Sequence, residues 1–201
     1  MSPVVQSFLK QLTRSRRRLL PIFLVLMGVL VLAMGGATQP QSSQTYELVG
    51  KVVRVADGDT LTLRQATNER IRLASIDSPE KSSGSDRPGQ PYAEAARKFL
   101  AEQVAGQSVK LLCFETDRYG RHICDVPIKD GGPLTTVNQS LVLAGMAWAN
   151  QQAGGKYLRD KSLLLLQAQA KAAKRGIWAE PNPTPPWVWR YECWRNGKCN
   201  K

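Results

Sequence analysis

Five short stretches of the 201-residue chain carry the alternating pattern of β-strands, and this pattern constrains the fold more than any other feature. In each stretch, β-branched or apolar residues recur at about every second position, as expected where one face of a strand is buried. The first two stretches are separated by an Asp-Gly sequence, which is a favoured hairpin turn. The five predicted strands are Glu47–Val55, Leu61–Arg64, Ile71–Ile76, Val109–Phe114 and His122–Ile128.

Helices are predicted around the last two strands. Pro91 suits the first turn of a helix that runs to about Ala105, because proline is well tolerated at the first helical position. Val137–Leu143 is predicted as a short helix ended by a glycine, and Tyr157–Lys174 as a longer one. This order of elements predicts a mainly β fold with α (α+β). It indicates a five-stranded Greek-key barrel of the OB type with about three helices packed on it.

The composition is that of one globular domain with a basic surface. The sequence has 28 Lys plus Arg against 16 Asp plus Glu, so its formal net charge is +12. Charge of this sign attracts polyanions such as nucleic acid, although it says nothing about the fold. A single histidine, His122, excludes most His-rich metal sites, and four cysteines are too few for a fold held mainly by disulfides.

Residues 1–37 have the layout of an export signal. They carry five basic residues and no acidic one, followed by the apolar run Leu19–Met34 and the small residues Gly35-Gly36-Ala37. The run is slightly long for a signal peptide and slightly short for a spanning helix. A cleaved signal peptide and a retained N-terminal membrane anchor therefore both stay open. Both place the rest of the chain outside the cytoplasm, with residues 38–45 as a polar linker.

The four cysteines agree with export, because each pair flanks a predicted turn. Cys193 and Cys199 bracket an Asn-Gly sequence and would close a small hairpin, and Cys113 and Cys124 could pair across two strands. These pairings are hypotheses, since four cysteines allow three connectivities. A zinc site is the competing interpretation, but the sequence has no CxxC pair.

Three polar segments stand out beside the predicted strands. They are Asp57-Gly58-Asp59-Thr60, then Arg72 with Asp77-Ser78-Pro79-Glu80, then Asp117-Arg118-Tyr119-Gly120-Arg121. Each segment alone is typical of an ordinary turn.

Together, in this order, the sequences VVRVADGDTLTL, RIRLASIDSPE and TDRYGRHICDV resemble the thermonuclease (staphylococcal nuclease) family. The resemblance runs from about Val52 to Trp178. It implies a thermonuclease-like OB-fold domain over residues 46–179, followed by a tail over 180–201 that contains Trp and Cys. It also implies Ca²⁺-dependent cleavage of DNA and RNA that leaves 3′-phosphate ends.

The resemblance implies roles for the carboxylates. Asp59, Asp77 and the backbone carbonyl of Ser78 match the family's metal ligands, and a hard cation such as Ca²⁺ takes oxygen ligands of this kind. Glu80 matches the general base. It lies three residues beyond Asp77, so a turn can bring it next to a water on the metal side.

The resemblance also implies roles for the cations. Arg72 and Arg121 match the two arginines that hold the scissile phosphate, whose oxygens a guanidinium can bind bidentately. Arg118 and Tyr119 match a loop that contacts the substrate's terminal phosphate.

Aromatic residues outside these segments have two interpretations. Trp148 follows Gly145-Met146-Ala147, where family members often place a base-stacking Tyr shortly afterwards, but core packing is the preferred reading. The tail mixes aromatic and basic residues over 187–191, and such a mixture can bind single-stranded nucleic acid. We expect instead that the tail folds back on the barrel and is locked by Cys193–Cys199.

The leading hypothesis is an exported, Ca²⁺-dependent endonuclease that acts on DNA and RNA with little sequence specificity, with single strands as the expected preference. The alternative is a catalytically inactive nucleic-acid-binding OB module at the cell surface. The three carboxylates favour the enzyme, because a binding module has no use for them together. A basic envelope protein that binds acidic polymers rests on charge alone. We expect a monomer, with membrane contact only through the N-terminal segment.

Overall fold

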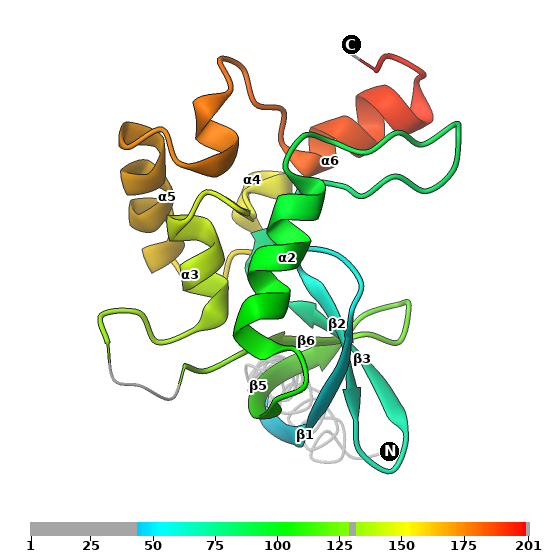
Figure 1. Ribbon diagram of the computed structural model, residues 1–201, viewed down its shortest axis with the longest axis vertical. Helices are drawn as coiled ribbons and strands as arrows, with labels where there is room; N and C mark the ends of the chain where they lie inside the picture. The colour runs from blue at the N-terminus through cyan, green and yellow to red at the C-terminus, as the bar shows by residue number, and fades with distance from the viewer. Residues whose placement is uncertain (1–43, 129–131, 200–201) are drawn as a thin grey trace, which may run out of the picture. The chain divides into compact units, whose positions relative to one another are not determined.

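The structure is a computed structural model that describes residues 44–128 and 132–199 (Figure 1). The predicted signal peptide or anchor and most of the predicted linker lie outside these residues. Within the described part, no helix has the length and apolar character needed to cross a membrane. The strands are β1 Tyr46–Val55, β2 Thr60–Arg64, β3 Asn68–Leu73, β4 Ile76–Asp77, β5 Ser108–Thr116, β6 His122–Asp125 and β7 Trp148–Ala149. The helices are α2 Ala93–Val104, α3 Val137–Leu143, α4 Gln152–Gly155, α5 Ser162–Ala172, α6 Pro186–Trp189, the 3₁₀ helix η1 Gly176–Ala179 and the π-helix η2 Arg190–Arg195.

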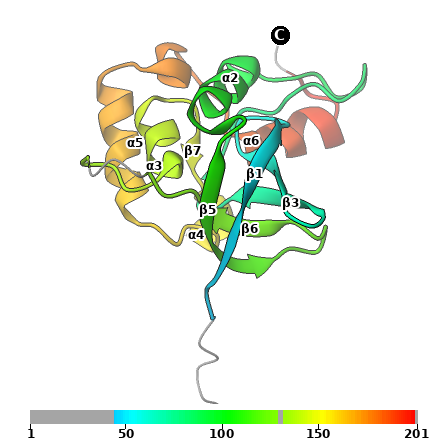
Figure 2. The ribbon, with the colours of Figure 1, turned by 60° about the horizontal axis from the view of Figure 1, so that its bottom comes forward.

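Five strands close into a barrel in the order β1-β2-β3-β6-β5. All neighbours are antiparallel except β3 and β6, which pair in parallel with Ile71 opposite His122. Figure 2 shows α3 and α5 on one side of this barrel, α2 across one end and α6 on the other side. The closed barrel with helices packed on it confirms the predicted α+β fold of the OB type.

Alternation along the strands fills the barrel. Leu61, Leu63, Ile71 and Leu73 are fully buried because they occupy the inward positions of β2 and β3. Helix α2 adds its apolar face, of which Leu100 is fully buried. A second cluster, with Trp148, Ala170, Ile177 and Trp178 buried, packs α5 against β7 and η1.

The third predicted strand is interrupted. The sequence predicts one strand over Ile71–Ile76, but β3 ends at Leu73 and a separate strand, β4, begins at Ile76. The break falls at Ser75, whose φ of 65° is left-handed. The backbone oxygen of Ser75 accepts from Asn150 N at 2.8 Å, and its hydroxyl accepts from Arg159 N at 3.0 Å. These contacts from later in the chain stabilise a bend that alternation alone does not predict.

The last predicted helix begins later than expected. The sequence predicts Tyr157–Lys174, whereas α5 covers Ser162–Ala172. Asp160 lies just before this start, and its carboxylate accepts from the N–H of Ser162, the first residue of α5, at 2.9 Å.

The predicted hairpin at the tail is wrong. Residues 186–195 are helical, with Pro186 at the first position of α6 and η2 continuing directly from it. Disulfides join Cys193 to Cys199 and Cys113 to Cys124, which are the two pairings that the predicted turns favour. The tail also packs on the loop before α2, since the indole N–H groups of Trp189 and Trp194 both donate to Pro88 O, at 3.0 and 2.9 Å.

Candidate active site

Pairing between β2 and β3 brings Asp59 next to Arg72. Thr60 lies opposite Arg72 in the register of these strands, so the residue before Thr60 reaches the same guanidinium. Leu73 N also donates to Asp59 O at 2.8 Å, which fixes the end of the turn. Asp57 closes the turn from the other side, because its carboxylate accepts from Asp59 N at 3.1 Å.

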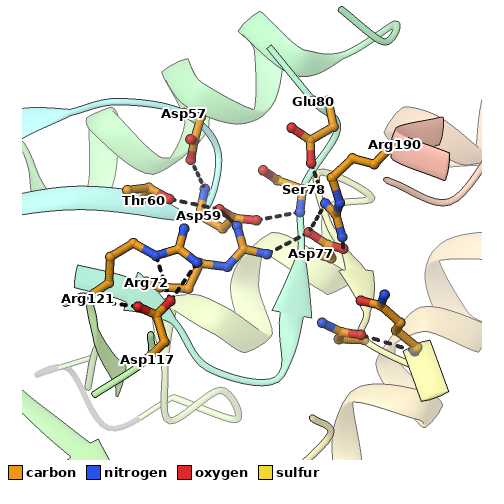
Figure 3. Close-up of polar contacts among 12 residues, drawn as sticks. Asp57, Asp59, Thr60, Arg72, Asp77, Ser78, Glu80, Asp117, Arg121 and Arg190 are labelled. Carbon is orange, nitrogen blue, oxygen red and sulfur yellow. Dashed lines mark hydrogen bonds and ion pairs between the residues drawn. The ribbon is translucent and has the colours of Figure 1, made fainter. Parts of the chain in front are cut away.

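The second carboxylate comes from β4. After the bend at Ser75, β4 leaves the barrel and pairs with β7, where Asp77 lies opposite Trp148. This pairing buries Asp77 completely and points its carboxylate toward Arg72 (Figure 3). Ser78 follows, and its backbone N–H donates to Asp59 Oδ2 at 2.7 Å. The turn before β2 and the end of β4 are therefore joined directly.

Gly58 allows this approach. A Cβ atom at Gly58 would lie 2.6 Å from Ala96 Cβ and 2.8 Å from Ser78 Cβ, closer than such atoms pack. Only glycine lets the turn sit between α2 and the residue after Asp77.

Arg72 lies between the two aspartates. One of its terminal nitrogens donates to Asp59 Oδ1, and the other donates to Asp77 Oδ1 at 2.6 Å. Burial alone would lower the pKa of Arg72, but the charges of Asp59 and Asp77 raise it above its ordinary value, so the guanidinium stays charged. Burial raises the pKa of Asp59 against the opposing effect of Arg72. Arg72 offsets only part of the effect of burial, so the pKa of Asp59 lies above its ordinary value.

These carboxylates suit a hard cation. Among the described residues, no group of three or more His, Cys, Asp or Glu side chains is placed to hold a metal ion. The Ca²⁺ site that the resemblance implies needs only two carboxylates, with a main-chain carbonyl and waters supplying the remaining oxygens. Asp59 and Asp77 share one guanidinium and have only oxygen to offer, so they fit such an ion.

Glu80 lies on the other side of Asp77, and it is paired with a residue that sequence analysis did not assign to the site. Arg190 of η2 donates from Nη1 to Glu80 Oε1, and from Nη2 to Asp77 Oδ2 at 2.9 Å (Figure 3). Burial raises the pKa of Glu80, and Arg190 opposes that rise. In the sequence, Arg190 stands out only as a basic residue among the aromatic residues of the tail, and nothing local predicts which way its side chain points.

The hairpin between β5 and β6 carries the remaining predicted residues. Arg121 is held by Asp117, whose Oδ2 accepts from Arg121 Nε at 2.8 Å. Arg118 lies over the ring of Tyr119, 4.8 Å from its centroid, and donates to its hydroxyl at 2.6 Å. Parallel pairing of β3 with β6 sets His122 opposite Ile71, so Arg121, just before β6, lies beside the strand that carries Arg72. Figure 3 draws Arg121 on the Arg72 side of the cluster, away from Arg190.

Trp148 is a core residue, as expected. It is 7% exposed, and its ring meets that of Trp178 edge to face with centroids 4.2 Å apart. Its backbone positions Asp77 through the β4–β7 pair.

Comparisons with known proteins agree with this geometry. The family model described as Staphylococcal nuclease homologue matches residues 70–180. An "Uncharacterized endonuclease" of Escherichia coli O157:H7 is 40% identical over 146 residues, which are 72% of this chain and 86% of that protein. A "Micrococcal nuclease" of Shigella flexneri is 37% identical over 147 residues, which are 70% of this chain and 79% of that protein. The chain belongs to the staphylococcal nuclease family.

Proposed function

We propose that this protein is an exported, Ca²⁺-dependent endonuclease that hydrolyses phosphodiester bonds of DNA and RNA with little sequence specificity. The observation that carries the proposal is the convergence of Asp59 and Asp77 on Arg72, with Glu80 joined to Asp77 through Arg190, from segments that are separate in sequence. A barrel that only binds nucleic acid would gain from arginines but not from three clustered carboxylates.

In this proposal, the residues of the site bind the metal, bind the phosphate or accept a proton. Asp59, Asp77 and the carbonyl of Ser78 would hold Ca²⁺, which when bound would neutralise a phosphate oxygen and orient a water molecule. Arg72 and Arg121 donate to the phosphate oxygens on which charge develops. The carboxylate of Glu80 accepts a proton from the attacking water while the oxygen of that water bonds to phosphorus. The bond from phosphorus to the 5′ oxygen breaks, that oxygen takes a proton from solvent water, and the products are a 3′-phosphate and a 5′-hydroxyl.

Cleavage by the full-length chain tests this proposal. Purified protein is incubated with single-stranded and double-stranded DNA and with RNA, in millimolar Ca²⁺ and again with excess chelator. We expect cleavage that requires Ca²⁺, is fastest on single strands and is lost in Glu80→Gln. Tight binding without cleavage under any divalent metal would instead support the nucleic-acid-binding module.

Export is the second part of the proposal, and it is supported by the two disulfides, which persist in oxidising compartments. Expression with the native N-terminus and fractionation of the cells tests it. We expect the protein outside the cytoplasm, and its intact mass distinguishes a signal peptide cleaved near Ala37 from a retained anchor. Reduced protein found only in the cytoplasm would contradict export.

A further inference from the structure

The C-terminal segment, residues 186–195, delivers a third arginine to the candidate active site. Arg190 contacts both oxygens of Asp77, at 3.2 Å from Nη1 to Oδ1 and 2.9 Å from Nη2 to Oδ2. Its Nη1 also donates to Glu80 Oε1. One guanidinium therefore joins a predicted metal ligand to the predicted general base.

The segment that carries Arg190 is anchored to the loop before α2. The indole N–H groups of Trp189 and Trp194 share the carbonyl oxygen of Pro88 as acceptor. Cys193 is buried and bonded to Cys199, so the end of η2 is closed covalently. A side chain carried by an element that is anchored through two indoles and closed by a disulfide keeps its direction, which is what a functional site requires.

A second connection runs through Gln90, in the loop before α2. Its side-chain oxygen accepts from Glu80 N at 3.0 Å, and its side-chain nitrogen donates to Thr184 O at 2.8 Å. The backbone of Glu80 is thus tied to the chain just before α6, while its carboxylate is tied to Arg190. Glu80 is therefore held at both ends, by Gln90 at its backbone and by Arg190 at its carboxylate.

The negative charges of Asp77 and Glu80 explain why an arginine is needed between them. Asp77 is fully buried, and its carboxylate lies close to that of Glu80 because one guanidinium contacts both. Without a cation between them, the two carboxylates would repel, and Glu80 would turn toward solvent on its flexible side chain. Arg190 contacts Oε1 of Glu80, and among the described residues no hydrogen bond is made to Oε2. That second oxygen is the one available to accept a proton.

We propose that Arg190 is a positioning residue of the nuclease site, which holds the carboxylate of Glu80 beside Asp77 in the orientation needed for proton transfer. The inference rests on the proposed function. It extends the site beyond the region that the family model matches, since Arg190 lies ten residues past the end of that match at residue 180.

The test compares full-length Arg190→Gln and Arg190→Lys with the wild type. Arg195→Gln is the matched control, because Arg195 lies in the same segment but is exposed and directed toward Tyr191. Three quantities are measured: kcat and KM on single-stranded DNA at saturating Ca²⁺, the affinity for Ca²⁺ by calorimetry without nucleic acid, and the melting temperature. Kinetics are recorded well below the lowest melting temperature.

We expect Arg190→Gln to lower kcat about 10²-fold with KM nearly unchanged, the scale expected when a catalytic group is misplaced by about 1 Å. Arg190→Lys should restore part of kcat, since it keeps the charge without the fork. Ca²⁺ should bind Arg190→Gln about threefold more tightly or better, because Asp77 loses a competing cation. Arg195→Gln should match the wild type in all three quantities.

Other results would overturn the inference. An unchanged kcat in Arg190→Gln would show that Glu80 needs no such support, and a raised kcat would show that Arg190 obstructs the site. A lower kcat combined with weaker Ca²⁺ binding would indicate a structural role only. If the wild type itself does not cleave, the proposed function fails first, and equal Ca²⁺ affinity in Arg190→Gln and the wild type would then overturn the inference as well.

Discussion

At the scale of single residues, the site depends on charges that are buried against one another. Asp59 is 1% exposed and Asp77 0%, and both lie against Arg72. Buried carboxylates of this kind are stabilised only by partners, so removing one partner leaves an uncompensated charge. Substitutions that keep the shape and hydrogen bonds of a side chain are therefore the informative ones.

Glu80→Gln is such a substitution, and we expect it to lower the rate of cleavage at least about 10²-fold. The amide keeps an oxygen for Arg190 but cannot accept a proton from water. Binding of single-stranded DNA, measured by fluorescence anisotropy in Ca²⁺, should stay within a few-fold of the wild type. Substantial turnover in this variant would remove Glu80 from the role of base.

Asp125 offers a test that is separate from the site. Burial raises its pKa to about 6, with the charge of Asp160 adding to the rise. Because the folded-state pKa lies above the unfolded value, Asp125 contributes stability that is fully present below about pH 4. That contribution is lost as the pH rises through about 6.

Asp125→Asn should therefore be more stable than the wild type above about pH 7, by about 1–2 kcal/mol, and the gain should shrink toward about pH 4. The new side chain can still accept from Asn138 Nδ2, which donates to Asp125 Oδ1 at 2.9 Å. Urea unfolding at several pH values measures the effect, and Asp86→Asn in the exposed loop serves as the control. A gain that does not depend on pH would contradict this reasoning.

At the scale of elements, the site is made where short strands end. Asp59 precedes β2, Asp77 ends β4 and Arg121 precedes β6, so each of these three side chains is fixed by a ladder of backbone hydrogen bonds on one side only. The other side is fixed by packing, with α2 against the turn at Gly58 and the C-terminal segment against the loop at Pro88.

Gly58→Ala should disturb the first of these contacts. The added methyl group would meet Ala96 and Ser78 and push the turn away from both, so we expect a loss of stability of about 1–3 kcal/mol and a larger fractional loss of cleavage. Combining it with Ala96→Gly should recover part of the activity, because one of the two clashes is relieved. No recovery would mean that the contact with Ser78 dominates.

The barrel disulfide should matter most to stability. Cys113 and Cys124 are fully buried partners in the register of β5 and β6, 11 residues apart in sequence. Replacing both with Ala should lower the free energy of unfolding by about 3 kcal/mol, against about 2 kcal/mol for the pair Cys193 and Cys199, which closes a shorter loop. Guanidinium unfolding of both double variants measures this difference. A larger loss in the tail pair would contradict it.

The sequence predicts the barrel well because each strand carries its own local signal. Alternation and turn residues place β1, β2, β5 and β6 with small errors at their ends, and Val137–Leu143 is found with its observed bounds. The bend at Ser75 and the helical tail could not be predicted in this way. Ser75 adopts its left-handed backbone because Asn150 and Arg159 bind it from far along the chain. The tail is helical where its indoles reach Pro88.

The same distinction applies to the site. Resemblance to a family singles out the carboxylates and arginines of the three polar segments, and the structure brings Asp59, Arg72 and Asp77 into direct contact. Glu80 joins them through Arg190. Arg190 has no such local signature, because its role depends on where a distant segment packs.

At the scale of the whole molecule, net positive charge governs how nucleic acid is captured. The chain carries 28 basic against 16 acidic residues. Contacts between such a surface and phosphates weaken as salt rises, with a slope that counts the phosphates neutralised.

Arg118→Ala should lower this slope. Measured in the Glu80→Gln background, the logarithm of the affinity for single-stranded DNA against the logarithm of salt should lose about 0.7 in slope, the amount expected for one phosphate contact. Arg97→Ala is the control, since Arg97 lies on α2 and is paired with Glu94. Equal slopes for wild type and Arg118→Ala would remove Arg118 from the substrate path.

The parallel pair between β3 and β6 has a kinetic consequence. It joins Ile71 to His122 across about fifty residues, and β1 must also reach β5, so the barrel closes only through contacts that are distant in sequence. Such topologies fold slowly, because loop closure precedes most of the stabilising contacts. Arg72 and Arg121 are brought together by that same β3–β6 pair. Recovery of nuclease activity during refolding would therefore time the closure of the barrel.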